Sequence, residues 1–523
     1  MSIATRGFAI SFLLFIGLLT TFTTRNCRAD SLAERLAAVT ELPRYKSAHW
    51  GMLFVDLVSG DVILARDADK LFAPASCTKL YSVACALDAL GPDFRFKSPL
   101  HRRGEINSNG DLNGDLILVA SGDLSFGGRT NDQGEIAFTI LDHTYANGNT
   151  DGQLTAPDPL AGIRHLASEV AKAGIKRVHG DVLIDDRLFE KNTSTGSGPT
   201  RLTPIMVNDN LIDVTIAPAE IGQHAHVTWR PHTSAIRVDA KVDTVAKDKK
   251  TELKIHDLGH GKLQVTGHIP VGHKPVLRVH EMPDAAAFAR TLLIEALLQA
   301  KVKVDAPTIK TNSESALPHR TDYSQLPVVA QIVSPPFSES ARLILKVSHN
   351  LQASTLPLLV AVHHGQRTLM EGMRRQHEFL ARTGVDVETI SFGGGAGGAR
   401  GDFATPRATV QLLRKMNEHK EFATYFRALP VIGVDGTLTN AVKHDSPVRG
   451  KVHAKTGTYT VDNTLNGRSL LTSKAIAGYM ETATGKKLAF AVFVNNVHLR
   501  DGVTTTSIGQ DLGRLCEIVY QHQ

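Results

Sequence analysis

Ser76-Cys77-Thr78-Lys79 opens the stretch of sequence that decides the fold, because the residues from Thr78 to Leu90 are apolar and predict a helix. Residues three apart lie one helical turn apart, so Ser76 and Lys79 project from the same face. A serine hydroxyl becomes a nucleophile when a base takes its proton, and a desolvated lysine amine is such a base. The tetrapeptide therefore predicts a nucleophile and its base near a helix amino terminus.

A second motif, Ser348-His349-Asn350, occurs once in the chain and lies far downstream of the first. Ser348 and Asn350 are two positions apart, so both side chains can reach a cleft while His349 points elsewhere. We expect Ser348 to relay a proton to a leaving amine and Asn350 to bind a substrate amide. His349 is interpreted as a bystander rather than a general base.

A third motif, Lys455-Thr456-Gly457-Thr458, is also unique and predicts a strand that borders the same cleft. Lys455 supplies positive charge, Thr456 and Thr458 supply hydroxyl groups, and Gly457 allows a substrate backbone to come close. This cluster suits a substrate that ends in a carboxylate. The backbone N–H groups of Ser76 and Thr458 are the candidates for an oxyanion hole. The ordered set of three motifs indicates an acyl-transfer serine enzyme.

The two ends of the chain predict one antiparallel sheet with helices against its faces. Residues 49–66 resemble a hairpin, and three further strands are expected at 451–458, 475–481 and 488–495. A final helix is expected over 507–520. The fold class is therefore α+β, an α/β sandwich with a five-stranded antiparallel sheet.

The intervening residues have a different, strand-rich character, with alternating stretches at 224–245 and 252–271. We interpret them as one or two inserted β-rich accessory domains. The predicted organisation is a signal peptide, a first catalytic part, the accessory insertion and a second catalytic part, at residues 1–29, 30–97, 98–311 and 312–523.

The amino terminus has the layout of a secretory signal, with Arg6, an apolar run from Gly7 to Leu19, and a cleavage site after Ala29. An uncleaved membrane anchor is the alternative. Removal of this segment leaves 55 basic and 52 acidic residues and reduces the formal net charge from +6 to +3. Such a small excess, without a Lys/Arg run, does not indicate nucleic-acid binding.

Metal and nucleotide sites are not indicated by the sequence. Cys77, Cys85 and Cys516 form no C-x-x-C pair and are expected to be buried and free, and no H-E-x-x-H motif is present. The run from Gly393 to Gly398 lacks the Gly-Lys-Ser/Thr ending of a phosphate loop. We expect it to be a flexible loop near the cleft, with no cofactor bound.

The three motifs together resemble the penicillin-recognising serine enzymes, and more narrowly the class C low-molecular-mass penicillin-binding proteins. These are D-alanyl-D-alanine carboxypeptidases and endopeptidases. The interval of 272 positions between Ser76 and Ser348 is the discriminating feature, since this group carries insertions there. The resemblance implies the penicillin-recognising serine hydrolase fold. It also implies roles for eight residues: Ser76, Lys79, Ser348, Asn350 and Lys455 in catalysis, and Thr456, Gly457 and Thr458 in substrate binding.

The resemblance further implies peptidoglycan peptides as substrates, β-lactams as acylating inhibitors and a periplasmic or cell-envelope location, with peripheral membrane or wall association left open. Two departures from the family pattern are present: His349 stands where an aspartate is common, and Gly393 to Gly398 replaces an Asp-Gly-Ser-Gly segment. A β-lactamase, a D-amino-acid amidase or esterase, and a non-catalytic wall-binding homologue are the alternatives.

Overall fold

The computed structural model describes residues 31–523, so the predicted signal peptide lies outside the described residues. The central sheet has the strand order β19-β20-β21-β1-β2 and every pairing in it is antiparallel. Its strands are β1 (His49–Asp56), β2 (Val62–Arg66), β19 (Val452–Asn463), β20 (Arg468–Glu481) and β21 (Lys487–Asn495). The five-stranded antiparallel sheet is thus confirmed, and the short β22 (Val497–His498) adds a sixth strand beside β20.

Strand β1 is buried on both faces, which explains its continuous apolar run from Trp50 to Val55. Trp50 and Phe54 belong to the apolar core on one face, and Leu53 and Val55 belong to the core on the other. Successive side chains of a strand point to opposite faces, so a single strand holds both layers together.

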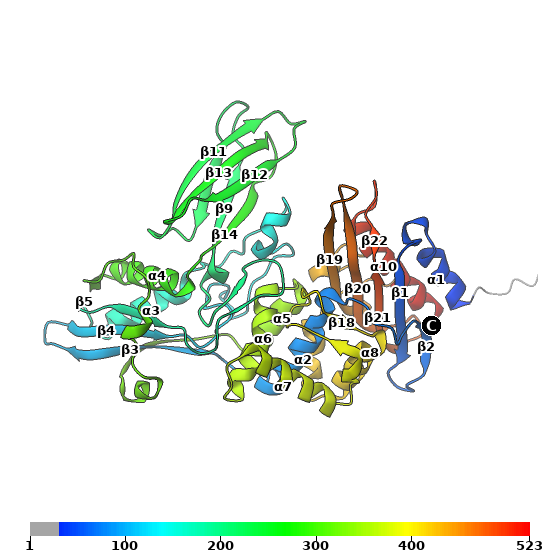
Figure 1. Cartoon of the computed structure of the whole chain (residues 1–523), viewed down its shortest axis with the longest axis horizontal. Coiled ribbons are helices and arrows are strands. Elements are labelled where there is room, and N and C mark those ends of the chain that lie inside the picture. The colour runs from blue at the N-terminus through cyan, green and yellow to red at the C-terminus, as the bar shows by residue number, and fades with distance from the viewer. Residues whose placement is uncertain (1–30) are drawn as a thin grey trace, which may run out of the picture.

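Helices cover the two faces of this sheet, as Figure 1 shows. One face packs against α1 (Leu32–Thr40) and α10 (Thr505–His522). The other packs against a larger group that includes α2, the helix predicted after Ser76. The members of that group are α2 (Lys79–Leu90), α5 (Phe337–Lys346), α6 (Asn350–His363), α7 (Leu369–Arg382), α8 (Pro406–Glu418) and α9 (Phe422–Ala428). The predicted α/β sandwich is therefore confirmed.

The strand-rich middle of the chain forms three further sheets of three or more strands, with a separate apolar core. The largest has the order β15-β5-β4-β3-β16, with β6 beside β4, and packs against α3 (Ala161–Lys172) and α4 (Ala285–Gln299). Its strands are β3 (Lys97–Ile106), β4 (Asp111–Val119), β5 (Arg177–Val178), β6 (Val182–Asp185), β15 (Lys303–Val304) and β16 (Val328–Val333).

Two three-stranded sheets project from this layer (Figure 1). They consist of β9 (Leu211–Ala217), β10 (His226–Arg230), β14 (Val276–Glu281), and of β11 (Arg237–Val245), β12 (Glu252–Asp257), β13 (Lys262–Pro270). Two small sheets each consist of a pair of two-residue strands: β7 (Asn192–Thr193) with β8 (Arg201–Leu202), and β17 (Ile390–Ser391) with β18 (Phe403–Ala404).

We call residues 98–311 the accessory region. Strand β16 pairs with β3 although it lies beyond residue 311, so the accessory sheet draws one strand from later in the chain. The domain boundaries themselves stay a prediction. Among residues 31–523, no helix has both the length and the apolar character that crossing a bilayer requires.

Candidate active site

The first motif lies where a short 3-10 turn, Ala75–Thr78, leads into α2. Ala75 has a positive φ of 46°, a backbone conformation that non-glycine residues rarely adopt, and it precedes Ser76 directly. The Nζ of Lys79 lies 2.8 Å from the Oγ of Ser76. The predicted same-face placement of these two side chains is therefore what the structure shows.

The amine of Lys79 is held from two other parts of the chain. Its Nζ lies 2.6 Å from the Oδ1 of Asn350 and 2.8 Å from the carbonyl oxygen of Ala396. A neutral amine has two N–H donors and one lone pair. It can therefore donate to these two oxygens and still accept the proton of the Ser76 hydroxyl.

The surroundings favour that neutral form. Burial lowers the pKa of Lys79 well below its ordinary value, and the positive charge of Lys455 lowers it further. Within residues 31–523, no carboxylate lies at salt-bridge distance from Lys79. Lys79 thus meets the electrostatic requirement for a general base.

Strand β19 brings the third motif against the turn that carries Ser76. The Sγ of Cys77 lies 3.3 Å from the carbonyl oxygen of Lys455, and the Nζ of Lys455 donates to the carbonyl of Thr456 at 2.7 Å. Burial lowers the pKa of Lys455 to about 8. A Cβ at Gly457 would lie 2.4 Å from the carbonyl oxygen of Pro74, so only glycine allows this approach of strand and turn.

The second motif lies at the start of α6. Ser348 has a positive φ of 64°, and its carbonyl accepts a hydrogen bond from the hydroxyl of Tyr145. The Nδ2 of Asn350 donates to the Oγ of Ser197 at 2.7 Å. His349 is fully buried and points away from the cleft, into a group of charged residues of the accessory region.

A cavity of about 590 Å³ joins these elements. Five of the eight predicted site residues line it, and the other three, Lys79, Lys455 and Gly457, are buried behind its wall. The lining site residues are Ser76, Ser348, Asn350, Thr456 and Thr458. The three motifs therefore converge on one cavity that exposes the Ser76 hydroxyl.

Two polar residues of this cavity, Lys474 and Thr437, are not among the eight predicted site residues. The Nζ of Lys474 on β20 donates to the Oγ1 of Thr458 at 2.9 Å, and burial lowers the pKa of Lys474 to about 8. The Oγ1 of Thr456 donates to the Oγ1 of Thr437 at 2.7 Å. The β19–β20 pairing places Lys474 directly opposite Thr458, and only this register identifies it as part of the site.

The glycine-rich loop lies beside the cleft as predicted, but it is closely packed instead of open. Residues 394–397 are buried, and a Cβ at Gly397 would lie 1.9 Å from the carbonyl of Ala75. Gly395 comes equally close to the carbonyl of Ala353, so its Cβ would lie 2.1 Å away. The glycines therefore let the loop present the Ala396 carbonyl to Lys79.

One group of side chains in the described residues has the spacing of a metal site: Asp142, Asp209 and His349. The guanidinium of Arg129 already bonds to both carboxylates, at 2.8 Å from Asp142 and 2.6 Å from Asp209. The position that a cation would take is thus filled by an arginine.

Comparison with known proteins gives one family and several relatives. The D-Ala-D-Ala carboxypeptidase 3 (S13) family matches residues 32–512. A D-alanyl-D-alanine carboxypeptidase of Actinomadura sp. (strain R39) is 27% identical over 499 residues, which cover 90% of this chain and 82% of the relative. D-alanyl-D-alanine carboxypeptidase DacB of Haemophilus influenzae is 23% identical over 467 residues, 86% of each chain.

The fold is also that of a solved structure. The crystal structure of penicillin binding protein 4 (dacB) from Haemophilus influenzae superposes with a TM-score of 0.70 at 20% identity. The match covers 93% of this chain and 99% of that chain, so the shared architecture includes the accessory region. The predicted penicillin-binding fold with additional β-rich parts is confirmed.

Proposed function

This chain belongs to the D-Ala-D-Ala carboxypeptidase 3 (S13) family of peptidases, and on that premise we propose that it cleaves peptidoglycan stem peptides through an acyl-enzyme on Ser76. It is a serine-type D-Ala-D-Ala carboxypeptidase and endopeptidase that β-lactams acylate. The observation that carries the proposed site is the position of the Lys79 amine, 2.8 Å from the Ser76 hydroxyl with its other contacts filled by neutral oxygens.

In the proposed acylation step, Lys79 takes the proton of Ser76 while the serine oxygen attacks the penultimate D-Ala carbonyl. The backbone N–H groups of Ser76 and Thr458 stabilise the oxyanion. Ser348, which lines the same cavity, relays the proton from Lys79 to the departing amine, and Lys79 becomes neutral again. Collapse of the tetrahedral intermediate breaks the C–N bond and releases the terminal residue.

Deacylation returns the enzyme to its starting state. A water molecule replaces the departed residue, and the neutral Lys79 amine takes one of its protons as the oxygen attacks the ester. The Ser76 oxygen leaves and regains a proton from Lys79. A β-lactam acylates Ser76 in the same way, but its leaving group stays attached and hinders the approach of water.

Positive charge at the cavity suits the carboxylate of the departing residue. Lys474 lines the cavity beside Thr458, and Lys455 lies behind Thr456. A carboxylate next to the scissile amide is shared by a terminal D-Ala and by the D-centre of a cross-linked diamino acid. The same contacts therefore serve carboxypeptidase and endopeptidase substrates.

The location proposed for this enzyme follows from its substrate and from the secretory layout of residues 1–29. We place it in the periplasm or elsewhere in the cell envelope, where peptidoglycan peptides are its partners. Peripheral association with the wall or membrane is a separate part of this proposal, and cell fractionation tests it.

The test of the proposed function uses a diacyl-D-Ala-D-Ala peptide and benzylpenicillin. We expect release of free D-Ala, together with a slowly hydrolysed penicillin adduct, and loss of both in Ser76→Ala. Labelling without D-Ala release would favour a non-catalytic penicillin-binding homologue. Rapid turnover of penicillin would instead favour a β-lactamase.

A further inference from the structure

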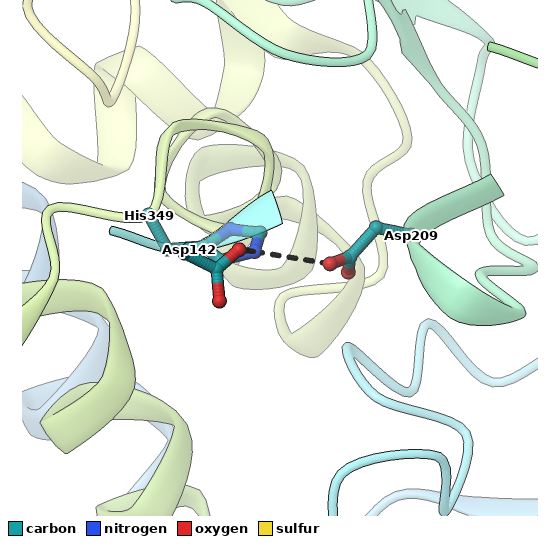
Figure 2. Close-up of side chains that lie close together, drawn as sticks. All are labelled: Asp142, Asp209 and His349. Atoms are coloured by element: carbon teal, nitrogen blue, oxygen red, sulfur yellow. Dashed lines mark hydrogen bonds and ion pairs between the residues drawn. The ribbon is translucent and has the colours of Figure 1, made fainter. Parts of the chain in front are cut away.

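A group of buried ionisable side chains lies where the accessory region meets the start of α6. We call it the buried charge cluster: Arg129, Asp142, His143, Asp209, Asp213 and His349. Five of these residues belong to the accessory region, and the sixth is the middle residue of the second motif. Figure 2 shows His349 reaching from the catalytic part of the chain toward Asp209.

Ion pairs hold the accessory members of the cluster together. Arg129 donates to Asp142 at 2.8 and 3.0 Å and to Asp209 at 2.6 Å. The two ring nitrogens of His143 each lie 2.7 Å from a carboxylate, Asp213 on one side and Asp209 on the other. This arrangement suits a doubly protonated ring, which donates through both nitrogens.

The charges of the cluster balance once Arg230, a partly buried neighbour outside the cluster, is counted. Burial lowers the pKa of His143, but the carboxylates of Asp213 and Asp142 outweigh burial and raise it to about 10. His143 is therefore a cation at neutral pH, and Arg230 adds a further cation at 3.0 Å from Asp213. Three carboxylates thus face three cations, and loss of any one partner leaves a buried charge unpaired.

His349 connects this cluster to the catalytic motif. Its Nε2 lies 3.2 Å from the Oδ2 of Asp209, and its Nδ1 accepts from the backbone N–H of Gln352 at 3.4 Å. Because Nδ1 accepts the hydrogen bond that caps α6, a neutral ring carries its proton on Nε2, which faces Asp209 and also lies 3.4 Å from the Nη2 of Arg129. One ring therefore fixes the start of α6 and attaches it to the accessory region.

Both sides of this contact have strained backbone. Ser348 has φ +64°, and three consecutive residues, Asn208, Asp209 and Asn210, have φ values of 53°, 52° and 57°. Non-glycine residues keep such conformations where the surrounding structure holds them there, and they cluster at functional sites. The His349–Asp209 hydrogen bond joins the two strained segments directly.

We propose that the buried charge cluster positions the second catalytic motif by holding the His349 ring. With the ring fixed, Ser348 keeps its left-handed conformation facing the cavity and Asn350 reaches the Lys79 amine. His349 is thus a positioning residue, and the accessory region takes part in building the catalytic centre. This inference rests on the proposed function, since it concerns the rate of Ser76 acylation.

The test compares two substitutions that separate the two hydrogen bonds of the His349 ring, one to Gln352 and one to Asp209. His349→Asn keeps an acceptor near the Nδ1 position and loses the donor to Asp209, whereas His349→Gln places an N–H donor near the Nε2 position. We expect the first-order acylation rate constant with benzylpenicillin to fall about tenfold or more in His349→Asn, while the non-covalent dissociation constant changes less than about threefold. His349→Gln should keep most of the rate.

Asp209→Asn tests the other partner. It also replaces the carboxylate that Arg129 and His143 contact, so it should slow acylation at least as much as His349→Asn. The double variant should be no slower than Asp209→Asn alone, because that substitution already weakens the His349 contact. Asp181→Asn is the matched control: Asp181 also accepts from an arginine, Arg290, but within the accessory region and away from the second motif. It should lower the melting temperature without changing the acylation rate of the folded protein.

Folded His349→Asn and Asp209→Asn proteins that acylate at the wild-type rate would overturn the proposal. Equal losses in His349→Asn and His349→Gln would also overturn it, since the Asp209 contact would then be irrelevant. If Asp209→Asn does not fold, the two His349 variants decide the outcome. A wild-type protein that benzylpenicillin does not label would instead overturn the proposed function, and this inference with it.

Discussion

The Nζ of Lys79 lies 2.6 Å from the Oδ1 of Asn350, across 271 positions of sequence. This contact joins the first and second motifs, and Asn350 continues it to Ser197 of the accessory region at 2.7 Å. The amine that activates Ser76 is thus oriented by side chains from distant parts of the chain.

Replacement of the base should slow the chemical step and leave binding intact. In Lys79→Gln we expect the acylation rate constant to fall by about 10² to 10⁴, which is the usual contribution of general acid–base catalysis. The non-covalent dissociation constant for benzylpenicillin should change little, because Lys79 lies behind the cavity wall. Stopped-flow acylation kinetics separate the two constants. Lys172→Gln, at an exposed lysine, is the control.

The pH profile should reveal the influence of Lys455 on Lys79. The positive charge of Lys455 is one cause of the lowered pKa of Lys79. Removing it in Lys455→Met raises that pKa, so a higher pH is needed to obtain the neutral amine. The acid limb of the acylation profile should therefore move to higher pH. Lys474→Met should leave the acid limb in place, and an unmoved limb in Lys455→Met would refute the electrostatic argument.

Recognition of a free carboxylate should weaken as the pH rises through about 8, because Lys455 and Lys474 then lose their charge. We expect KM for a diacyl-D-Ala-D-Ala peptide to rise above that pH, with a smaller effect on kcat. Lys474→Met should raise KM at neutral pH and reduce its remaining pH dependence. A peptide with an amidated carboxyl terminus is the control, and an equal KM effect on it would contradict the assignment.

Gly457 should tolerate no side chain. An added Cβ would lie 2.4 Å from the carbonyl oxygen of Pro74, so Gly457→Ala must push β19 away from the turn that carries Ser76. We expect a loss of about 1–3 kcal/mol in the free energy of unfolding, together with slower acylation. Thermal and denaturant unfolding measure the first effect. Gly401→Ala is the control, because its Cβ would meet nothing within 4 Å.

The catalytic sheet and the helix after Ser76 could be predicted because their signals are local. The β1–β2 hairpin and α2 are marked by apolar runs and by turn residues. Strand β19 extends to Asn463 and strand β20 starts at Arg468, so both are longer than predicted. The additional residues are partly exposed and polar, and they therefore lack the apolar pattern on which the prediction depends. Pairing between neighbouring strands, and not local hydrophobicity, holds those extensions.

The site was predictable to the extent that unique motifs mark it, and the structure brings all eight predicted residues together around one cavity. Lys474 could not be found in this way, because its place depends on the register between β19 and β20. His349 points away from the cleft, as predicted, but its hydrogen bond to Asp209 could not be predicted. Asp209 lies 140 positions earlier in the chain, and no sequence pattern around the second motif indicates this contact.

The central claim is that three distant motifs converge on Ser76 and make its hydroxyl reactive toward amides. Peptide mapping by mass spectrometry after brief exposure to benzylpenicillin tests it most directly. The account predicts one covalent adduct, on the peptide that contains Ser76, and its absence in both Ser76→Ala and Lys79→Gln over the same brief exposure. A folded protein that forms no adduct, or forms it on another residue, would contradict the account.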